Sequence, residues 1–156
     1  FLTSHTEFMP NAFKVKAFRF LSKPIEDAMF YEAVNEAEKE ILNTEKIAVP
    51  LKNKVELINI KDIIYFEAYG DGTYIHTKNE IYDSAKQLNF WINEAGNEHF
   101  YRTHKSFFIA LRHIKCIGKS EVEMNYAKEI IPLSRRNSTT LKEISFKYIR
   151  KYAKFM

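Results

Sequence analysis

Apolar and polar residues alternate with a period of two along much of the chain beyond residue 46. Alternation of this kind is typical of strands that bury one face. It predicts short strands at 47–51, 55–60, 63–69, 73–77, 100–103, 106–111, 114–118, 122–126 and 129–133. Gly70-Asp71-Gly72 separates two of these runs and predicts a hairpin turn, because glycine adopts positive φ angles at no steric cost. Many short strands with few helices favour an all-β sandwich or small stacked sheets.

Two later segments carry apolar residues at helical spacing instead. Residues 85–95 predict a helix with Asp83 or Ser84 as its cap. The side chains that this helix would turn inward are Leu88, Trp91 and Ile92. A last helix is predicted to begin at Ser134 or Asn137. Its apolar stripe consists of Leu141, Ile144, Tyr148, Tyr152 and Phe155.

Residues 1–43 follow a third pattern, in which short apolar strands alternate with helices. The expected elements are a strand at 1–4, a helix at 7–15, a strand at 17–21 and an amphipathic helix at 25–42. This order is typical of α/β folds, but two strands cannot bury both faces of a sheet. The segment is therefore incomplete as a domain. We expect two parts, residues 1–43 and residues 44–156.

The composition narrows the class of protein. The chain has 13 Phe and 9 Tyr against 4 Gly and 4 Pro, which excludes a disordered chain. Its apolar runs are too short to span a membrane, so no membrane partner is expected. Cys116 is the single cysteine, which excludes an internal disulfide. We expect it to be a buried strand residue in a cytoplasmic protein, because the sequence has no secretory signal.

The net charge of +4 is unevenly distributed. Residues 1–43 carry 5 Lys and Arg against 7 Asp and Glu, whereas residues 44–156 carry 19 against 13. The excess is greatest beyond Ser134, where seven basic residues accompany one acidic residue, Glu143. A basic second part is typical of proteins that bind a polyanion, although a basic helix is also often just a solvated surface.

Motifs for catalysis and for metal binding are missing from the sequence. It has no glycine-rich phosphate loop and no serine or cysteine nucleophile motif. His99 and His104 are five residues apart without a third metal ligand at a suitable spacing, so neither a metal nor another cofactor is expected. The histidines, which also include His76 and His113, are expected to bond backbone or phosphate groups. Glu67, Glu121 and Glu123 are interpreted as ordinary strand charges.

The first part resembles a known family. Phe1-Leu-Thr-Ser and Ala17-Phe-Arg-Phe-Leu-Ser-Lys-Pro resemble the last third of a response-regulator receiver domain. The resemblance implies that Thr3 and Lys23 contact an aspartyl phosphate, that Phe20 is the switch aromatic, and that Lys23–Pro24 is a cis peptide. It also implies a sensor histidine kinase as partner. The phosphoacceptor aspartate would lie before Phe1, so we expect no phosphorylation of this chain in the family's way.

The second part resembles the LytTR DNA-binding domain. Three motifs carry the resemblance in order: Ile63-Ile-Tyr-Phe-Glu-Ala, Phe100-Tyr-Arg-Thr-His-Lys-Ser-Phe and Pro132-Leu-Ser-Arg-Arg. They extend over about residues 45–145, and a receiver is the usual partner of this module. The resemblance implies a mainly β fold of small antiparallel sheets, stacked as an elongated LytTR-like structure with short helices. An incomplete α/β receiver fragment would precede it.

The resemblance also implies three loops that contact DNA. The first supplies Tyr69, Asp71 and Thr73, the second His104, Lys105 and Ser106, and the third Arg135, Arg136 and Asn137. Arg136 matches the position of a base-reading arginine, and a guanidinium can bond guanine O6 and N7 together. Lys105 suits phosphate or the minor groove. The chain departs from the family at Gly72, where a larger residue is usual, and at Ala110, where asparagine is common.

Simpler interpretations of the same residues remain open. Residues 69–73 can be a plain hairpin turn, Arg102 and His104 can support the fold, and Arg135 and Arg136 can open a solvated helix. The sequence as a whole predicts a transcription factor of a two-component system that binds double-stranded promoter DNA, with a homodimer left open. The alternative is a protein-interaction module that uses the helix at 25–42 or the aromatic β surface. An enzyme is the least favoured class.

Overall fold

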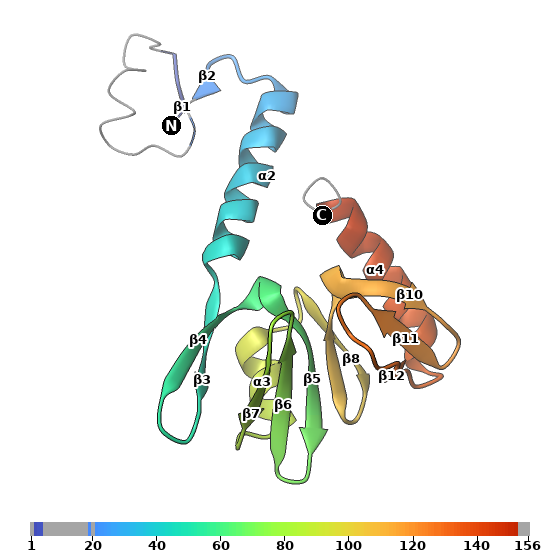
Figure 1. Cartoon of the computed structure of the whole chain (residues 1–156). Coiled ribbons are helices and arrows are strands. Elements are labelled where there is room, and N and C mark those ends of the chain that lie inside the picture. Colours follow the sequence, from blue (N-terminus) through green and yellow to red (C-terminus); the bar gives the residue numbers. More distant parts are fainter. Residues whose placement is uncertain (1, 5–18, 20, 153–156) are drawn as a thin grey trace. The chain divides into compact units, whose positions relative to one another are not determined.

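The computed structural model describes residues 2–4, 19 and 21–152 (Figure 1). By its internal contacts the chain divides into two compact units, Phe1–Thr44 and Glu45–Met156, and each is described by itself. Among the described residues, no helix combines the length and the apolar character that crossing a lipid bilayer requires.

The first unit contains two short strands and one helix within its described residues. Strand β1 (Leu2–Thr3) pairs in parallel with β2 (Leu21–Ser22), and the Lys23 amide donates to the Thr3 carbonyl at 2.8 Å. The Lys23–Pro24 peptide is cis, as predicted. Helix α2 (Asp27–Thr44) confirms the helix expected at 25–42 with a shift of two residues. The helix expected at 7–15 and the switch position Phe20 lie outside the described residues.

The second unit is built from three small antiparallel sheets, which confirms the mainly β prediction (Figure 1). The first sheet pairs β3 (Lys46–Pro50) with β4 (Val55–Asn59). The second has the order β7-β6-β5-β9-β8, from β5 (Ile63–Tyr69), β6 (Gly72–Thr77), β7 (Ile81–Ser84), β8 (Phe100–His104) and β9 (Phe107–Ala110). The third joins β10 (Ile114–Ile117), β11 (Glu121–Met124) and β12 (Ile131–Pro132). Single 3-10 turns at Ile60–Asp62 and Leu111–His113 connect strands.

Strand β7 was not predicted, and its presence changes the start of the next helix. Asp83 and Ser84, expected as helix caps, belong to β7 and pair with Tyr74 and Thr73 of β6. The Ser84 hydroxyl accepts a hydrogen bond from the Lys86 amide, so it closes a turn rather than a helix end. Helix α3 (Leu88–Ala95) therefore begins three residues later than expected. It buries Leu88 and Trp91, as predicted, and leaves Ile92 half-buried.

The main core lies where α3 packs against β5 and its neighbours. Phe66 is fully buried at its centre, with its ring centroid 5.9 Å from Trp91, 5.5 Å from Phe100 and 5.8 Å from Phe108. Alternation along β5, β8 and β9 turns Phe66, Phe100 and Phe108 to the face of the five-stranded sheet on which Trp91 of α3 packs. Apolar residues of β3 and β4 extend the same cluster.

Further buried residues lie outside that cluster, among them residues of the last helix and of the third sheet. Helix α4 (Asn137–Tyr152) buries Leu141, Ser145, Tyr148 and Tyr152. The third sheet and the segment after it bury Val122, Met124, Ile131 and Leu133. The predicted stripe is confirmed at three positions, Ile144 is half-buried, and Phe155 lies outside the described residues.

The prediction that Cys116 is buried is wrong. The register of β10 against β11 shifts between Ile114 and Cys116, which indicates a bulge or other irregularity in the ladder. A bulge interrupts the alternation of the two faces. Lys115 and Cys116 are consequently both exposed, although they are neighbours on one strand.

The histidines only partly follow the prediction that they bond backbone or phosphate groups. Nδ1 of His104 accepts from the Ser106 amide, and Nε2 of His113 lies 2.9 Å from the Lys61 carbonyl. His76 and His99 contact side chains instead, the Glu67 carboxylate at 2.9 Å and the Tyr148 hydroxyl at 3.2 Å. Glu67 is therefore a pairing partner within the sheet, not an ordinary strand charge, because the register places it diagonally from His76.

Acid is expected to destabilise the fold through His113. Burial lowers the pKa of His113 to about 4, although its hydrogen bond to the Lys61 carbonyl acts in the opposite direction. In the unfolded chain this group titrates near pH 6.5, at roughly the ordinary value. Its contribution to stability is therefore complete above about pH 6.5 and is lost as the pH falls towards 4, by up to about 1.4 kcal/mol per pH unit.

Urea unfolding at pH 7.5 and at pH 4.5 measures this effect. The matched variant is His113→Gln, which keeps an N–H donor for the Lys61 carbonyl but does not titrate. The parent should lose more stability than the variant between the two pH values. Equal losses in both proteins would assign the acid sensitivity to other groups.

Candidate nucleic-acid interface

Two of the predicted contact loops lie at one edge of the five-stranded sheet. The β5–β6 hairpin turns at Gly70-Asp71, and the β8–β9 hairpin turns at Lys105-Ser106. Strand β5 pairs with β9 so that Glu67 faces Phe107, and the Ala68 amide donates to the Ser106 carbonyl at 2.8 Å. Because β5 and β9 are neighbours, both hairpins end at the same edge of the sheet (Figure 1).

Hydrogen bonds hold the third predicted loop beside the second. The Ser134 amide donates to the Thr103 carbonyl at 3.1 Å, next to the β8–β9 turn. The Asn137 side chain donates to the carbonyls of Arg102 and Thr103 at 3.1 and 3.2 Å. Arg135 and Arg136 are exposed in the turn that precedes α4. The second loop thus has the first and the third as neighbours, although about thirty residues of sequence separate it from each of them.

The first loop is held by an aromatic stack. The rings of Tyr69 and Tyr74 lie 3.9 Å apart and nearly parallel. The Tyr69 hydroxyl donates to the Asp83 carboxylate, and this hydrogen bond raises the pKa of Tyr69 to about 12. Gly70 has a φ of +43°, which confirms the expected use of glycine at the turn. Asp71 is exposed at the tip of the hairpin.

Gly72 has a steric role in the same loop. A Cβ atom there would lie 2.8 Å from the Ser84 carbonyl oxygen and 3.0 Å from the Tyr69 ring. The stack and β7 together therefore exclude a larger residue while the loop has this conformation. Thr73 is fully buried, because it shares the inward face of β6 with Ile75. In this conformation its side chain has no exposed surface with which to contact DNA, contrary to the prediction.

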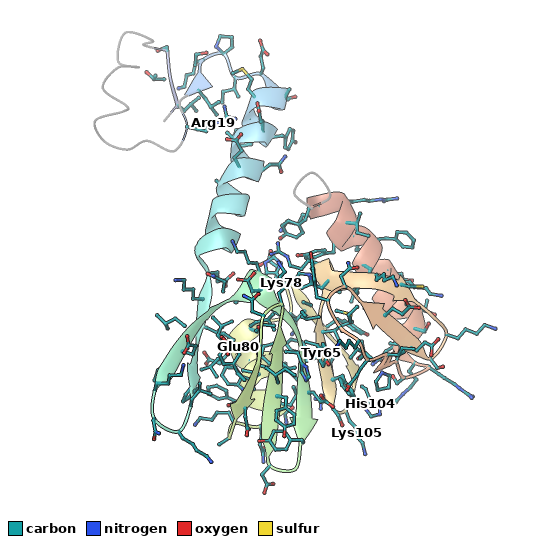
Figure 2. The ribbon with its side chains drawn as sticks, in the orientation of Figure 1. Arg19, Tyr65, Lys78, Glu80, His104 and Lys105 are labelled. Carbon is teal, nitrogen blue, oxygen red and sulfur yellow. The ribbon has the colours of Figure 1, made fainter. Side chains whose placement is uncertain are left out.

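The second loop is supported by the exposed side chain of Arg102. Its guanidinium donates to the carbonyls of His104 at 3.3 Å and Lys105 at 2.7 Å, and to the Asn89 side chain at 3.2 Å. Of the two interpretations of Arg102, the geometry favours support of the fold. Lys105 is exposed, and Ser106 is half-buried behind it. Figure 2 shows His104 and Lys105 together at this end of the molecule.

The protonation of His104 follows from its local contact. Nδ1 accepts a hydrogen bond from the Ser106 amide at 3.3 Å, so in the neutral ring the proton is on Nε2. The ring is half-buried, and Nε2 is then a hydrogen-bond donor. A donor of this kind suits the oxygen of a phosphate.

Three cations of the loops have no carboxylate partner among the residues that the structure describes. Within residues 21–152, neither Lys105, Arg135 nor Arg136 forms an ion pair. No group of acidic, histidine or cysteine side chains among the described residues could hold a metal ion. The arrangement can therefore bind an anion through three exposed side chains on a rigid edge.

The LytTr DNA-binding domain family matches residues 53–145. This stretch is more than half of the chain and contains all three loops. The chain belongs to the LytTR family. Residues 45–52, which contain the whole of β3, precede the matched stretch of the LytTR domain.

Several relatives extend the match beyond this domain. The transcriptional regulatory protein LytR of Staphylococcus aureus strain N315 is 27% identical over 131 residues, which cover 74% of this chain and 53% of LytR. The sensory transduction protein LytT of Bacillus cereus is 25% identical over 166 residues, covering 86% of this chain and 68% of LytT. The chain thus spans about half the length of LytR.

A solved structure supports the fold. A LytTr DNA-binding domain from Bacillus cereus matches 65% of this chain and 96% of its own, with a TM-score of 0.55 and 19% identity. At this sequence identity the likeness shows the fold alone.

Three supporting residues of the LytTR interface were missed from the sequence. Tyr74 and Asp83 hold Tyr69, and Asn89 holds Arg102. Tyr74 could have been found from the predicted hairpin, which places it diagonally from Tyr69, whereas the role of Asp83 depends on the pairing of β7 with β6. Nothing local to Asn89 indicates its contact, because the residue lies on α3, far from Arg102 in sequence.

Proposed function

We propose that this chain is a sequence-specific DNA-binding transcriptional regulator of a two-component system, whose LytTR domain reads promoter DNA with three loops. The observation that carries the proposal is the placement of the three predicted contact loops along one edge. Membership of the LytTR family supports it, as do the named regulators LytR and LytT among the relatives.

Each loop has a proposed role that follows from its chemistry. Arg136 reads a guanine in the major groove through its planar fork. Lys105 and Arg135 bind phosphates, His104 and Ser106 donate to phosphate oxygens, and Tyr69 and Asp71 contact the adjacent groove. Asn137 is assigned a positioning role, because its amide already bonds the backbone of β8.

The first unit is proposed to be a fragment of a receiver domain, residues 1–43. The parallel pairing of β1 with β2 and the bond from Lys23 to Thr3 are what adjacent receiver strands require. Thr3 and Lys23 would contact the aspartyl phosphate, with Phe20 as the switch aromatic. A cytoplasmic location, a sensor histidine kinase as partner and a homodimer belong to the same proposal.

Binding is expected to weaken steeply with salt if the loops neutralise phosphates. The logarithm of the binding constant should fall linearly with the logarithm of salt concentration, by about 0.9 for each phosphate neutralised. Lys105→Ala should weaken binding to promoter and random DNA alike and reduce the slope by roughly one. Lys52→Ala is the matched control, because Lys52 is an exposed lysine of the β3–β4 turn and belongs to none of the three loops.

A salt series of gel shifts with both variants and both DNAs measures these slopes. A slope that Lys105→Ala leaves unchanged would remove Lys105 from the phosphate contacts. Equal affinity for promoter and random DNA in the parent protein would contradict sequence-specific binding itself.

A further inference from the structure

The second unit has an apolar groove on α4, separate from the three loops. It lies between α4 and the β10 strand, has a volume of about 300 Å³ and is open to solvent. Ile114 and Ile117 contribute to one side, and Phe146 and Ile149 to the other. Clefts of roughly 300–1,000 Å³ are typical of binding sites, so the groove is at the small end of that range.

Two large apolar side chains of α4 that line the groove are exposed to solvent. Phe146 is 67% exposed and Ile149 is 46% exposed, whereas Leu141 and Tyr148 of the same helix are buried. Helix α4 thus has one apolar stripe inside the fold and a second one towards solvent. Adjoining exposed apolar side chains over a hollow are typical of a surface that another molecule covers.

The charge around the groove restricts what that molecule can be. Lys115 and Lys142 line it, and none of its described lining residues is a carboxylate. Lys115 pairs with Glu123 at 3.0 Å, while Lys142 forms no ion pair with any described residue. A DNA duplex would satisfy the lysines but would offer nothing to cover Phe146 and Ile149. An acidic segment with an apolar stripe satisfies both.

We propose that this groove docks an acidic amphipathic helix of a partner protein. Apolar side chains of such a helix, spaced three and four residues apart, would enter between Phe146, Ile149 and Ile117. Its carboxylates would face Lys142 and Lys115. This inference does not depend on DNA binding by the loops. The docked partner would nevertheless lie near the third loop, because Lys142 follows Arg136 by six residues, or roughly 9 Å along a helix.

The chain offers its own reporter for this site. Cys116 is its single cysteine, is exposed and lines the groove. The rate at which a neutral reagent, iodoacetamide, alkylates Cys116 therefore measures whether the groove is covered. The probe is a synthetic 18-residue peptide of Leu, Glu and Ala with leucines at helical spacing. Saturating peptide should slow alkylation at least fivefold, and a peptide of the same composition with scrambled leucines should not.

Variants of exposed residues identify the surface without disturbing the core. Phe146→Ala should weaken the peptide, measured by fluorescence anisotropy, by roughly tenfold, as truncation of a central interface aromatic does. Lys142→Glu should weaken it by several fold, and more at low salt. The control is Ile81→Ala, which removes an apolar side chain of 59% exposure from β7.

Binding that protects Cys116 and is lost in Phe146→Ala, but kept in Ile81→Ala, supports the proposal. Peptide binding that leaves the alkylation rate unchanged, or that Phe146→Ala leaves intact, overturns it, as does failure of the peptide to bind. A gel shift of Phe146→Ala on promoter DNA separates the two functions, because this variant should bind DNA like the parent. A loss of DNA binding in the Arg136 variants would leave the result at the groove unaffected.

Discussion

Arg136→Lys is expected to weaken binding to promoter DNA by roughly one to two powers of ten while random DNA binds almost unchanged. Lysine keeps the positive charge but loses the planar fork that bonds two acceptors of one guanine. The turn that carries Arg136 is fixed on both sides, by the Ser134 and Asn137 bonds to β8. The backbone at Arg136 therefore loses little conformational freedom when its side chain meets a base.

Arg135→Lys is the matched control for this prediction. It makes the same chemical change one residue away, at a position that we assign to phosphate. Quantitative gel shifts at one salt concentration give, for each variant, the ratio of its affinity for promoter DNA to its affinity for random DNA. If Arg136→Lys binds the promoter as tightly as the parent, base reading belongs to another loop, and the β5–β6 tip is the next candidate.

Phe66→Ala is expected to reduce the free energy of unfolding by about 3–5 kcal/mol, in the range of other buried Phe truncations. Phe66 is fully buried and its ring packs against three further aromatic rings. Its removal leaves a cavity that Trp91, Phe100 and Phe108 cannot fill without leaving their positions in α3, β8 and β9.

Urea unfolding of Phe66→Ala and Phe146→Ala tests this directly, because both variants lose the same atoms. Phe146 is 67% exposed, so its truncation should change stability by less than about 0.5 kcal/mol. Similar losses in the two variants would mean that the cluster around Phe66 is not the main core.

Most strands could be predicted because each buries one face, so that large apolar residues alternate with polar ones along the sequence. Strand β7 has only four residues and includes Asp83 and Ser84, which elsewhere cap helices. It is a strand because β6 offers an unpaired edge, which is a long-range fact that no local pattern contains. Cys116 was misplaced for a similar reason, since the irregularity in β10 depends on its pairing with β11.

The positions of the contact loops came from a family resemblance, whereas their support could be learned only from the fold. Gly72 is small because Ser84 and Tyr69 meet there, and Thr73 is buried because it shares the inward face of β6 with Ile75. Arg102 joins the carbonyls of His104 and Lys105 to the Asn89 side chain of α3. Ala110, which stands where asparagine is common in the family, lies in the apolar core cluster. Each of these facts depends on tertiary neighbours.

The short, bonded turns have a consequence for the kinetics of DNA binding. Two of the loops are two-residue turns of paired strands, and the third is held by three hydrogen bonds to β8. In the proposed complex, association would need no ordering step, so the encounter rate would be set by diffusion and by attraction between Lys105, Arg135 and the phosphates. Salt would act mainly on that rate. The fit of Arg136 to its base would set the lifetime of the complex, and a correct promoter would differ from a wrong one in how slowly it lets the protein go.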